Sequence, residues 1–307
     1  MKSIRYSFAL LSLFLAFAFA NVARATDVDG PDDCARAHED FGDAPEAIPA
    51  YPSGVLGHFP TCLVPSAPGT RTFVCPPIST PPGPTGYILH VQGIAGYWLG
   101  CYPTPTGPMG IDSEPDGKVA LGGGPSACGG IPTDCIEPSF PGMSFGQDEC
   151  YADGSDAGIT SPISFAACAV SAVSFFTWSC TPATQQSPRF LNICVDWNGD
   201  GDWNDNFSCP NGACAFEWAV KNAPIAIPPG CALLTSPAFL TGPFDTYAWL
   251  RISLTDTPVP DDYPWAGSAT VPGGNYFGGE TEDYPVAVGH ATATSRSTWG
   301  RVKTLYR

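Results

Sequence analysis

Ten residues in the middle of the chain, Asp196 to Asp205, carry enough oxygen donors to bind a metal ion. Asp196, Asn198 and Asp200 alternate and Gly201 follows directly, which is the first half of a calcium-binding loop. Alternate side chains converge on one ion only if the backbone wraps around it, and glycine permits that sharp turn. Four carboxylates within ten residues repel one another unless a cation offsets their charge. The loop therefore predicts a bound metal.

The loop is not an EF-hand, because its twelfth position is Phe207 instead of glutamate and a strand-like segment precedes it. We predict a strand-borne calcium loop whose distal carboxylate comes from Asp205 or Glu217. Magnesium is disfavoured because it retains water in preference to an all-protein cage. The side chains predicted to bind calcium are Asp196, Asn198, Asp200, Asp202, Asp205 and Glu217. The competing interpretation is an Asn/Asp/Gly hairpin turn that binds no ion.

Two aromatic side chains, Trp197 and Trp203, lie inside this loop. If they are exposed, they could stack on sugar rings beside the calcium ion. If they are buried, they roof the ion site and cover the edges of the fold. The sequence leaves both interpretations open.

The first 25 residues predict a secretory signal peptide. Lys2 and Arg5 precede an apolar run that ends at Ala20, and residues 23–25 form an A-x-A cleavage site. Removal of this segment leaves ten basic residues against 29 acidic ones, a formal net charge of about −19. Such a charge argues against binding to nucleic acid or to anionic membranes, and it suits a divalent-cation binder. No later segment reaches the roughly 20 apolar residues of a spanning helix, so we expect an exported protein without a membrane span.

The 13 cysteines all follow this signal, and in an exported chain they predict disulfides. Zinc is the rival interpretation, but no C-x-x-C pair occurs and only four histidines are present. An odd count leaves at least one free thiol or one intermolecular bond. Cys209 and Cys214 are a plausible local pair.

The distribution of turn residues predicts an all-β fold. Glycine and proline number 34 each, so few stretches are long enough for a helix. Short β-rich segments recur between turns, and we predict an antiparallel β-sandwich, jelly-roll-like, with long disulfide-stapled loops. The segments predicted as strands are Ile163–Phe176, Phe190–Trp197, Glu217–Val220, Ala238–Leu240, Tyr247–Leu254 and Tyr284–Val288, with one or two further strands between Gly86 and Leu99.

Four regions are expected: a signal peptide at 1–25, a Pro/Gly/Cys-rich acidic N-terminal region at 26–160, a β-sandwich at 161–288 and a basic tail at 289–307. The tail carries Arg296, Arg301, Lys303 and Arg307 and no acid. It is either a frayed terminus or a tag that docks to an export or surface-attachment system.

Catalysis has little support in the sequence. Residues 142–146 match the G-x-S-x-G pattern of hydrolases around Ser144, but that motif needs a strand before it and a helix after it. Here Pro138 and Pro141 precede the motif and a glycine-bearing polar loop follows it. We therefore expect a non-enzymatic protein, with a secreted hydrolase as the weakest alternative.

Several motifs occur in an order that resembles the GEVED domain. The signature-like hexapeptide is Gly279–Tyr284 (GETEDY), where the family has valine in place of threonine. The accompanying motifs are Asp40–Pro45 (DFGDAP), Asp112–Gly117 (DSEPDG), the acidic step from Asp148 to Gly154, Val195–Trp203 (VDWNGDGDW) and the strand Trp249–Ser253 (WLRIS). The resemblance implies a secreted bacterial protein whose C-terminal part is a β-sandwich within a surface or cell-envelope architecture. It also implies that Glu217 takes the place of the glutamate that follows the loop in the family, after an inserted segment containing Cys209 and Cys214.

The acids of the signature, Glu280, Glu282 and Asp283, leave two interpretations open. They form a second calcium site or contribute to the first, or they support a turn and pair with a residue such as Arg251. Together these features predict a secreted, calcium-stabilised structural or adhesion protein of the cell surface, whose partner is an extracellular protein or glycan. A carbohydrate-binding module of the cell envelope is the alternative.

Overall fold

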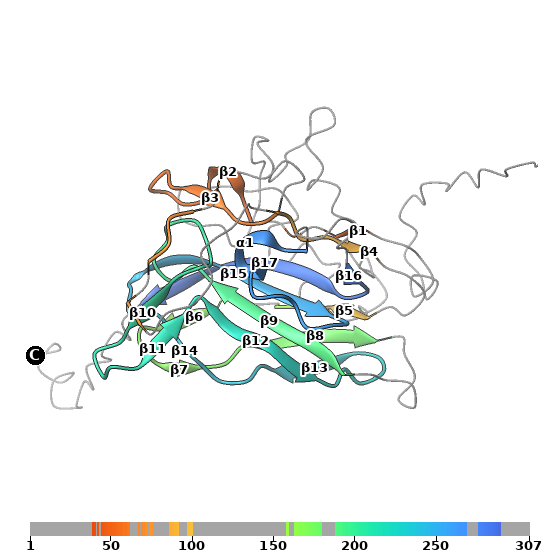
Figure 1. Ribbon diagram of the computed structural model, residues 1–307. Coiled ribbons are helices and arrows are strands. Elements are labelled where there is room, and N and C mark those ends of the chain that lie inside the picture. Colours follow the sequence, from red (N-terminus) through yellow and green to blue (C-terminus); the bar gives the residue numbers. More distant parts are fainter. Residues whose placement is uncertain are drawn as a thin grey trace, which may run out of the picture.

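The computed structural model describes residues 39–40, 42, 44–61, 67, 69–72, 74–75, 86–91, 97–100, 158–159, 163–179, 188–268 and 276–289. Within these ranges the chain is almost entirely β-structure, with one short helix (Figure 1). The signal peptide, the acidic motifs at 112–117 and 148–154, the segment around Ser144 and the basic tail lie outside the described residues.

The elements follow one another in a regular order along the chain. The strands are β1 Glu39–Asp40, β2 Glu46–Pro49, β3 Leu56–His58, β4 His90–Val91, β5 Tyr97–Leu99, β6 Ser164–Ala166, β7 Val170–Ser171, β8 Ser174–Ser179, β9 Arg189–Val195, β10 Asn206–Ser208, β11 Cys214–Phe216, β12 Trp218–Ile225, β13 Ala232–Thr235, β14 Phe239–Leu240, β15 Thr246–Thr255, β16 Tyr276–Phe277 and β17 Glu280–Gly289. The helix α1 spans Tyr263–Ala266.

A five-stranded sheet in the order β12-β9-β15-β17-β6 forms the centre of the fold. Strand β15 pairs antiparallel with both β9 and β17, and only β6 joins the sheet in parallel. Successive side chains of a strand point to opposite faces. Leu250 and Ile252 of β15 therefore face one side of the sheet, and Trp249 and Arg251 face the other.

One face of this sheet packs on a second layer, which contains the sheets β13-β8-β5 and β14-β7. Apolar residues of β9, β15 and β17 meet Leu99, Phe175 and Phe239 from the second layer in one buried cluster. This arrangement confirms the prediction of an all-β fold built as an antiparallel β-sandwich. Strand β5, from the front half of the chain, pairs with β8 within it.

The other face of the central sheet is covered by N-terminal residues and by the segment that contains α1. Figure 1 shows β2 and β3 above β15 and β17, with β8 and β13 below. Ala50, Tyr51 and Phe59 pack there against Trp203 and Trp249 in a second buried cluster. The central strands are therefore buried on both faces, so polar side chains on the upper face must find partners within the protein.

Two disulfides differ from the local pair that the sequence suggested. Cys75 is bonded to Cys214, and Cys168 is bonded to Cys209. The predicted Cys209–Cys214 bond is wrong because the two residues lie in the β10–β11 hairpin, where Cys214 stands opposite Ser208. Cys209 is the next residue along, so its side chain points to the opposite face of the hairpin.

The disulfides indicate an oxidising environment, such as the periplasm or the cell exterior. In the parts of the chain that the structure describes, no helix has the length and apolar character needed to cross a membrane.

A free thiol, Cys194, accounts for one cysteine that a disulfide does not use. Its side chain is fully buried in β9 against the N-terminal layer, and this burial raises the pKa of the thiol. Because the thiolate is the reactive form, we expect iodoacetamide to leave Cys194 unmodified in the native protein and to modify it after denaturation without reductant. Peptide mass spectrometry measures this, with the disulfide-bonded Cys168 and Cys209 as internal controls that stay unmodified in both samples. Modification of Cys194 in the native protein would contradict its burial.

Candidate metal centre

The acidic loop begins where β9 ends and leads into β10. Asp196 continues the pairing of the sheet, since its N–H donates to the carbonyl oxygen of Trp249 at 3.0 Å. The chain then turns through Gly199 and Gly201, whose φ angles are 68° and 95°. Gly201 is also required for space, because a Cβ there would lie 2.2 Å from the carbonyl oxygen of Leu56 in β3. The N-terminal layer therefore presses directly on the loop.

Asp196 organises the loop through both of its carboxylate oxygens. Oδ1 accepts hydrogen bonds from the N–H groups of Gly199 and Asp200, at 2.7 and 3.2 Å. Oδ2 accepts from the N–H of Gly201 at 2.8 Å and from the hydroxyl of Tyr51 at 2.6 Å. The side chain is completely buried. Asp196 thus holds the turn in a shape that gathers the remaining acids around it.

Glu217 reaches the loop because the β10–β11 hairpin folds back on itself. Its N–H donates to the carbonyl oxygen of Asp205 at 3.0 Å. Its carboxylate accepts from the N–H groups of Trp197 and Asp205, at 3.0 and 2.9 Å. The inserted hairpin therefore returns a fully buried glutamate to the loop, in the place that the sequence resemblance implied.

The structure brings five of the predicted ligand residues together in two overlapping groups. Asp196, Asp200 and Glu217 form the first group, and Asp200, Asp202 and Asp205 form the second. Within each group, one oxygen from every residue lies within 4.8 Å of the others. Calcium–oxygen distances of about 2.3–2.6 Å place ligands of one ion at such separations. Both groups are therefore compatible with a metal site.

Asn198, the sixth predicted ligand, bridges two carboxylates. Its Nδ2 donates to Oδ2 of Asp200 and to Oδ2 of Asp205, at 2.9 Å in both cases. Its Oδ1 accepts from the N–H of Asp200 at 3.1 Å. In this conformation the amide presents its nitrogen, not its oxygen, to the acids.

Burial gives these carboxyl groups unusual acidity. Desolvation, followed by repulsion from Asp200, raises the pKa of Asp196 to about 8 and that of Asp202 to about 9. Desolvation also raises the pKa of Asp205 to about 7, and it raises the pKa of Glu217 well above the usual range. Ionised carboxylates in this environment are destabilised unless a cation is present, so the donor set fits a divalent metal ion.

Residues of the N-terminal region close the site, and the sequence analysis missed them. Besides Tyr51, the N–H of Thr72 donates to Oδ1 of Asp205. Nε of Arg71 donates to the carbonyl oxygen of Asn204 at 3.3 Å. Tyr51 is 145 positions from Asp196, and Thr72 is 133 positions from Asp205. No local spacing rule connects positions so far apart.

Trp197 and Trp203 do not form a ligand-stacking surface. They are 0% and 1% exposed, respectively. Trp197 lies in the sandwich core, with its Nε1 donating to the carbonyl oxygen of Phe216 at 2.8 Å. Trp203 packs on Phe59, with ring centroids 4.3 Å apart. The predicted role in sugar stacking is wrong, because the two rings insert into the clusters on opposite faces of the central sheet.

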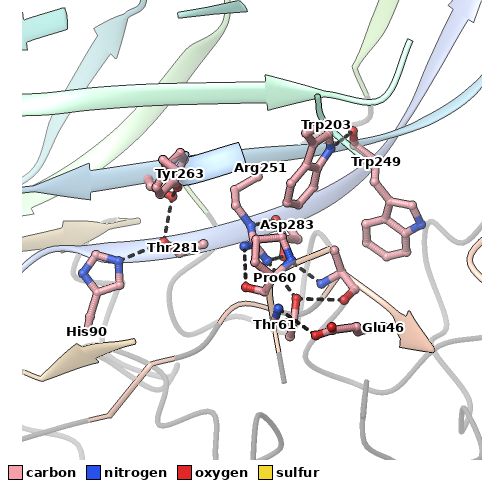
Figure 2. A network of polar contacts seen from close by, with 12 residues as sticks. Glu46, Pro60, Thr61, His90, Trp203, Trp249, Arg251, Tyr263, Thr281 and Asp283 are labelled. Carbon is pink, nitrogen blue, oxygen red and sulfur yellow. Dashed lines mark hydrogen bonds and ion pairs between the residues drawn. The ribbon is translucent and has the colours of Figure 1, made fainter. Parts of the chain in front are cut away.

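The signature acids lie within β17 and point in different directions. Asp283 stands opposite Arg251, whereas Glu280 and Glu282 stand opposite Leu254 and Ile252 on the sandwich-core face. Asp283 accepts from Nε and Nη2 of Arg251, at 2.7 and 2.5 Å (Figure 2). The three acids therefore do not form one metal site. The pairing with Arg251 that the sequence offered as its alternative is present.

The chain has no match among family models, curated proteins or solved structures.

Proposed function

We propose that this chain is a secreted, calcium-stabilised β-sandwich of the GEVED type that acts as a structural or adhesion protein at the cell surface, without catalytic activity. The observation that carries the proposal is the convergence of five carboxylates in a buried loop. Disulfides and the strong negative charge of the chain agree with an extracellular location where calcium is abundant.

The first calcium ion is assigned to Asp196, Asp200 and Glu217. A carboxylate oxygen that accepts one or two N–H bonds still contributes to coordination, because an ionised carboxylate offers about four lone-pair sites. Oδ1 of Asp200 has no hydrogen-bond partner within the described residues and is the best placed to bind directly. Rotation of the Asn198 amide by about 180° would add its oxygen as a fourth ligand.

The ion would act as a fastener between elements that are distant in the sequence. Asp196 ends β9 in the central sheet, and Glu217 stands between β11 and β12. Tyr51, from the N-terminal layer, donates its hydroxyl proton to Asp196. Calcium bound here would hold the sheet, the hairpin and the N-terminal layer in one arrangement, which is a structural role.

Calorimetry tests the calcium assignment directly. At a calcium concentration about 100 times the dissociation constant, the folded state gains roughly 2.7 kcal/mol. For a chain of this size we expect the melting temperature to rise by roughly 5–10 °C compared with a sample in chelator. Glu217→Gln should lose most of this rise. Asp261→Asn, which removes an exposed acid paired with Lys221, should retain it. Equal melting temperatures in calcium and in chelator would rule out a stabilising ion.

The surface location is tested separately. Protease treatment of intact cells that express the full chain should digest this protein and spare a cytoplasmic marker. Protection of the chain in intact cells, with digestion only after lysis, would contradict the proposal. The alternative of a carbohydrate-binding module depended on exposed loop tryptophans, and their burial removes that support.

A further inference from the structure

We infer that the loop holds a second calcium ion, bound by Asp200, Asp202 and Asp205 beside the first. The two sites would share Asp200, and in this respect the inference rests on the proposed function. The second site nevertheless has its own ligands, since Asp202 and Asp205 do not belong to the first group.

The strongest observation is an orphaned oxygen on Asp202. The residue is 1% exposed, and its Oδ1 accepts from the N–H of Asn204 at 3.0 Å. Its Oδ2 has no hydrogen-bond partner within the described residues. An unpaired buried carboxylate oxygen is strongly unfavourable, so such atoms normally have a partner or bind a metal. A cation shared with Asp200 and Asp205 supplies that partner.

Neighbouring atoms point to the same place. Oδ1 of Asp200, which belongs to both groups, also lacks a hydrogen-bond partner among the described residues. Asn204 is 3% exposed, and neither Oδ1 nor Nδ2 of its side chain has a partner in the described part of the chain. Unsatisfied buried polar atoms are rare in folded proteins, and here they occur on three residues within one five-residue segment.

Backbone packing shields the orphaned oxygen from bulk water. Gly69 lies against Asp202, and a Cβ at this glycine would fall 1.8 Å from Oδ2. No side chain fits between them, so the partner of this oxygen must be as small as an ion or a water molecule.

The balance of charge favours two ions over one. The two groups contain five carboxylates, and Arg71 is the cation that acts on Asp202 and Asp205. Arg71 also lies over the ring of Trp265, 5.3 Å from its centroid, which holds its guanidinium at the edge of the loop. The ionised cluster with this arginine carries a formal charge of minus four. One divalent cation halves this charge, and two cancel it.

Counting bound calcium ions in the folded chain by native mass spectrometry and titration calorimetry tests the inference. The wild-type protein should bind two ions in this loop. Asp202→Asn should bind one ion fewer through loss of the second site, and Glu217→Gln should bind one ion fewer through loss of the first. Asp261→Asn, the exposed surface control, should bind as many ions as the wild type.

The outcomes separate the two proposals. A single wild-type ion that survives Asp202→Asn and disappears in Glu217→Gln overturns the second site and leaves the first intact. A single ion with the reverse pattern supports the Asp200–Asp202–Asp205 site and overturns the first assignment. An unchanged count in Asp202→Asn, or no binding by the wild type, overturns the inference. If Asp202→Asn does not fold, anomalous scattering from terbium-soaked wild-type crystals decides: two adjacent peaks in the loop support the second site, and one peak beside Glu217 overturns it.

Discussion

Replacing Arg251 with methionine should destabilise the folded protein by about 3–5 kcal/mol. Arg251 is 1% exposed and forms a bidentate ion pair with Asp283, which is 2% exposed. Loss of the arginine leaves an uncompensated carboxylate inside the protein, and no water can reach it. The penalty comes from this unpaired charge rather than from the intrinsic strength of the ion pair.

The surroundings of Arg251 use the remaining donors of its guanidinium. Nη1 donates to the carbonyl oxygen of Pro60 at 3.1 Å, and Nη2 donates to Oγ1 of Thr61 at 3.0 Å (Figure 2). The guanidinium carbon lies 4.5 Å from the centroid of the Trp203 ring. Arg251→Lys should therefore also be destabilising, because an ammonium cannot reproduce the planar bidentate contact.

Chemical denaturation with the disulfides intact measures this effect, and the chain contains a matched control. Lys221 and Asp261 form an ion pair of similar length, 2.6 Å, but their side chains are 48% and 70% exposed. Lys221→Met should change the free energy of unfolding by no more than about 1 kcal/mol. The double variant Arg251→Met with Asp283→Leu should be more stable than Arg251→Met alone, since it removes the orphaned charge. Equal effects at Arg251 and Lys221 would contradict the buried network.

The motifs that the sequence analysis identified separately converge in this network. Asp283 of the signature also accepts a hydrogen bond from the N–H of Ala44, in the opening motif, at 2.7 Å. Gly42 of the same motif has a φ of 72°, and a Cβ there would lie 2.9 Å from Nη2 of Arg251. The signature, the arginine strand and the opening motif therefore resemble family motifs at positions where they contact one another. Their shared role in this chain is to lock the N-terminal layer onto the central sheet.

The part of the structure that follows from local pattern was predictable. Strands β9, β15 and β17 alternate apolar side chains toward the sandwich core, and the sequence showed this alternation. Asp196, Asp200 and Asp202 lie close in the chain, so their convergence required only a turn at Gly201. The contribution of Glu217 followed from its position after the inserted hairpin.

The contacts between distant segments were not predictable from one sequence. The burial of Trp197 and Trp203 depends on layers that assemble on both faces of the central sheet. The Cys75–Cys214 bond joins residues 139 positions apart. Strand β17 begins at Glu280 and not at Tyr284, because its pairing with β15 extends through the acidic signature. Polar residues in a strand hide this pairing from any rule that relies on hydrophobic alternation.

Without calcium, the protein should lose stability as the pH rises from about 4 to about 9. The pKa of Asp196 is raised from 3.8 to about 8 and that of Asp202 to about 9, mainly by burial. Within this window the folded state binds more protons than the unfolded state, so raising the pH favours unfolding. One unit of pKa corresponds to about 1.4 kcal/mol, and Asp196 alone therefore accounts for several kcal/mol. Calcium should reverse the trend, because it replaces the protons on the same oxygens.

Another buried group, His90, acts in the opposite direction and must be separated from this effect. Its ring accepts or donates hydrogen bonds with Oγ1 of Thr281 at 2.9 Å and the carbonyl oxygen of Gly278 at 3.2 Å. Burial lowers the pKa of His90 from 6.5 to about 3. The unfolded state therefore binds the extra proton, and stability is lost as the pH falls from about 6.5 towards 3. His90 lies outside the acidic loop, so its contribution is the same with and without calcium.

The quantity to measure is therefore the difference in unfolding free energy between calcium and chelator, determined at several pH values. His90 cancels in this difference, and the loop carboxylates do not. The difference should be small near pH 5, where the folded apo protein keeps its protons, and should grow by several kcal/mol towards pH 8. Calorimetric titration in buffers of different ionisation enthalpy should also show protons released as calcium binds. A calcium effect of equal size at pH 5 and pH 8 would mean that the ion does not bind at these carboxylates. The exposed-acid control Asp261→Asn should show the same pH trend as the wild type.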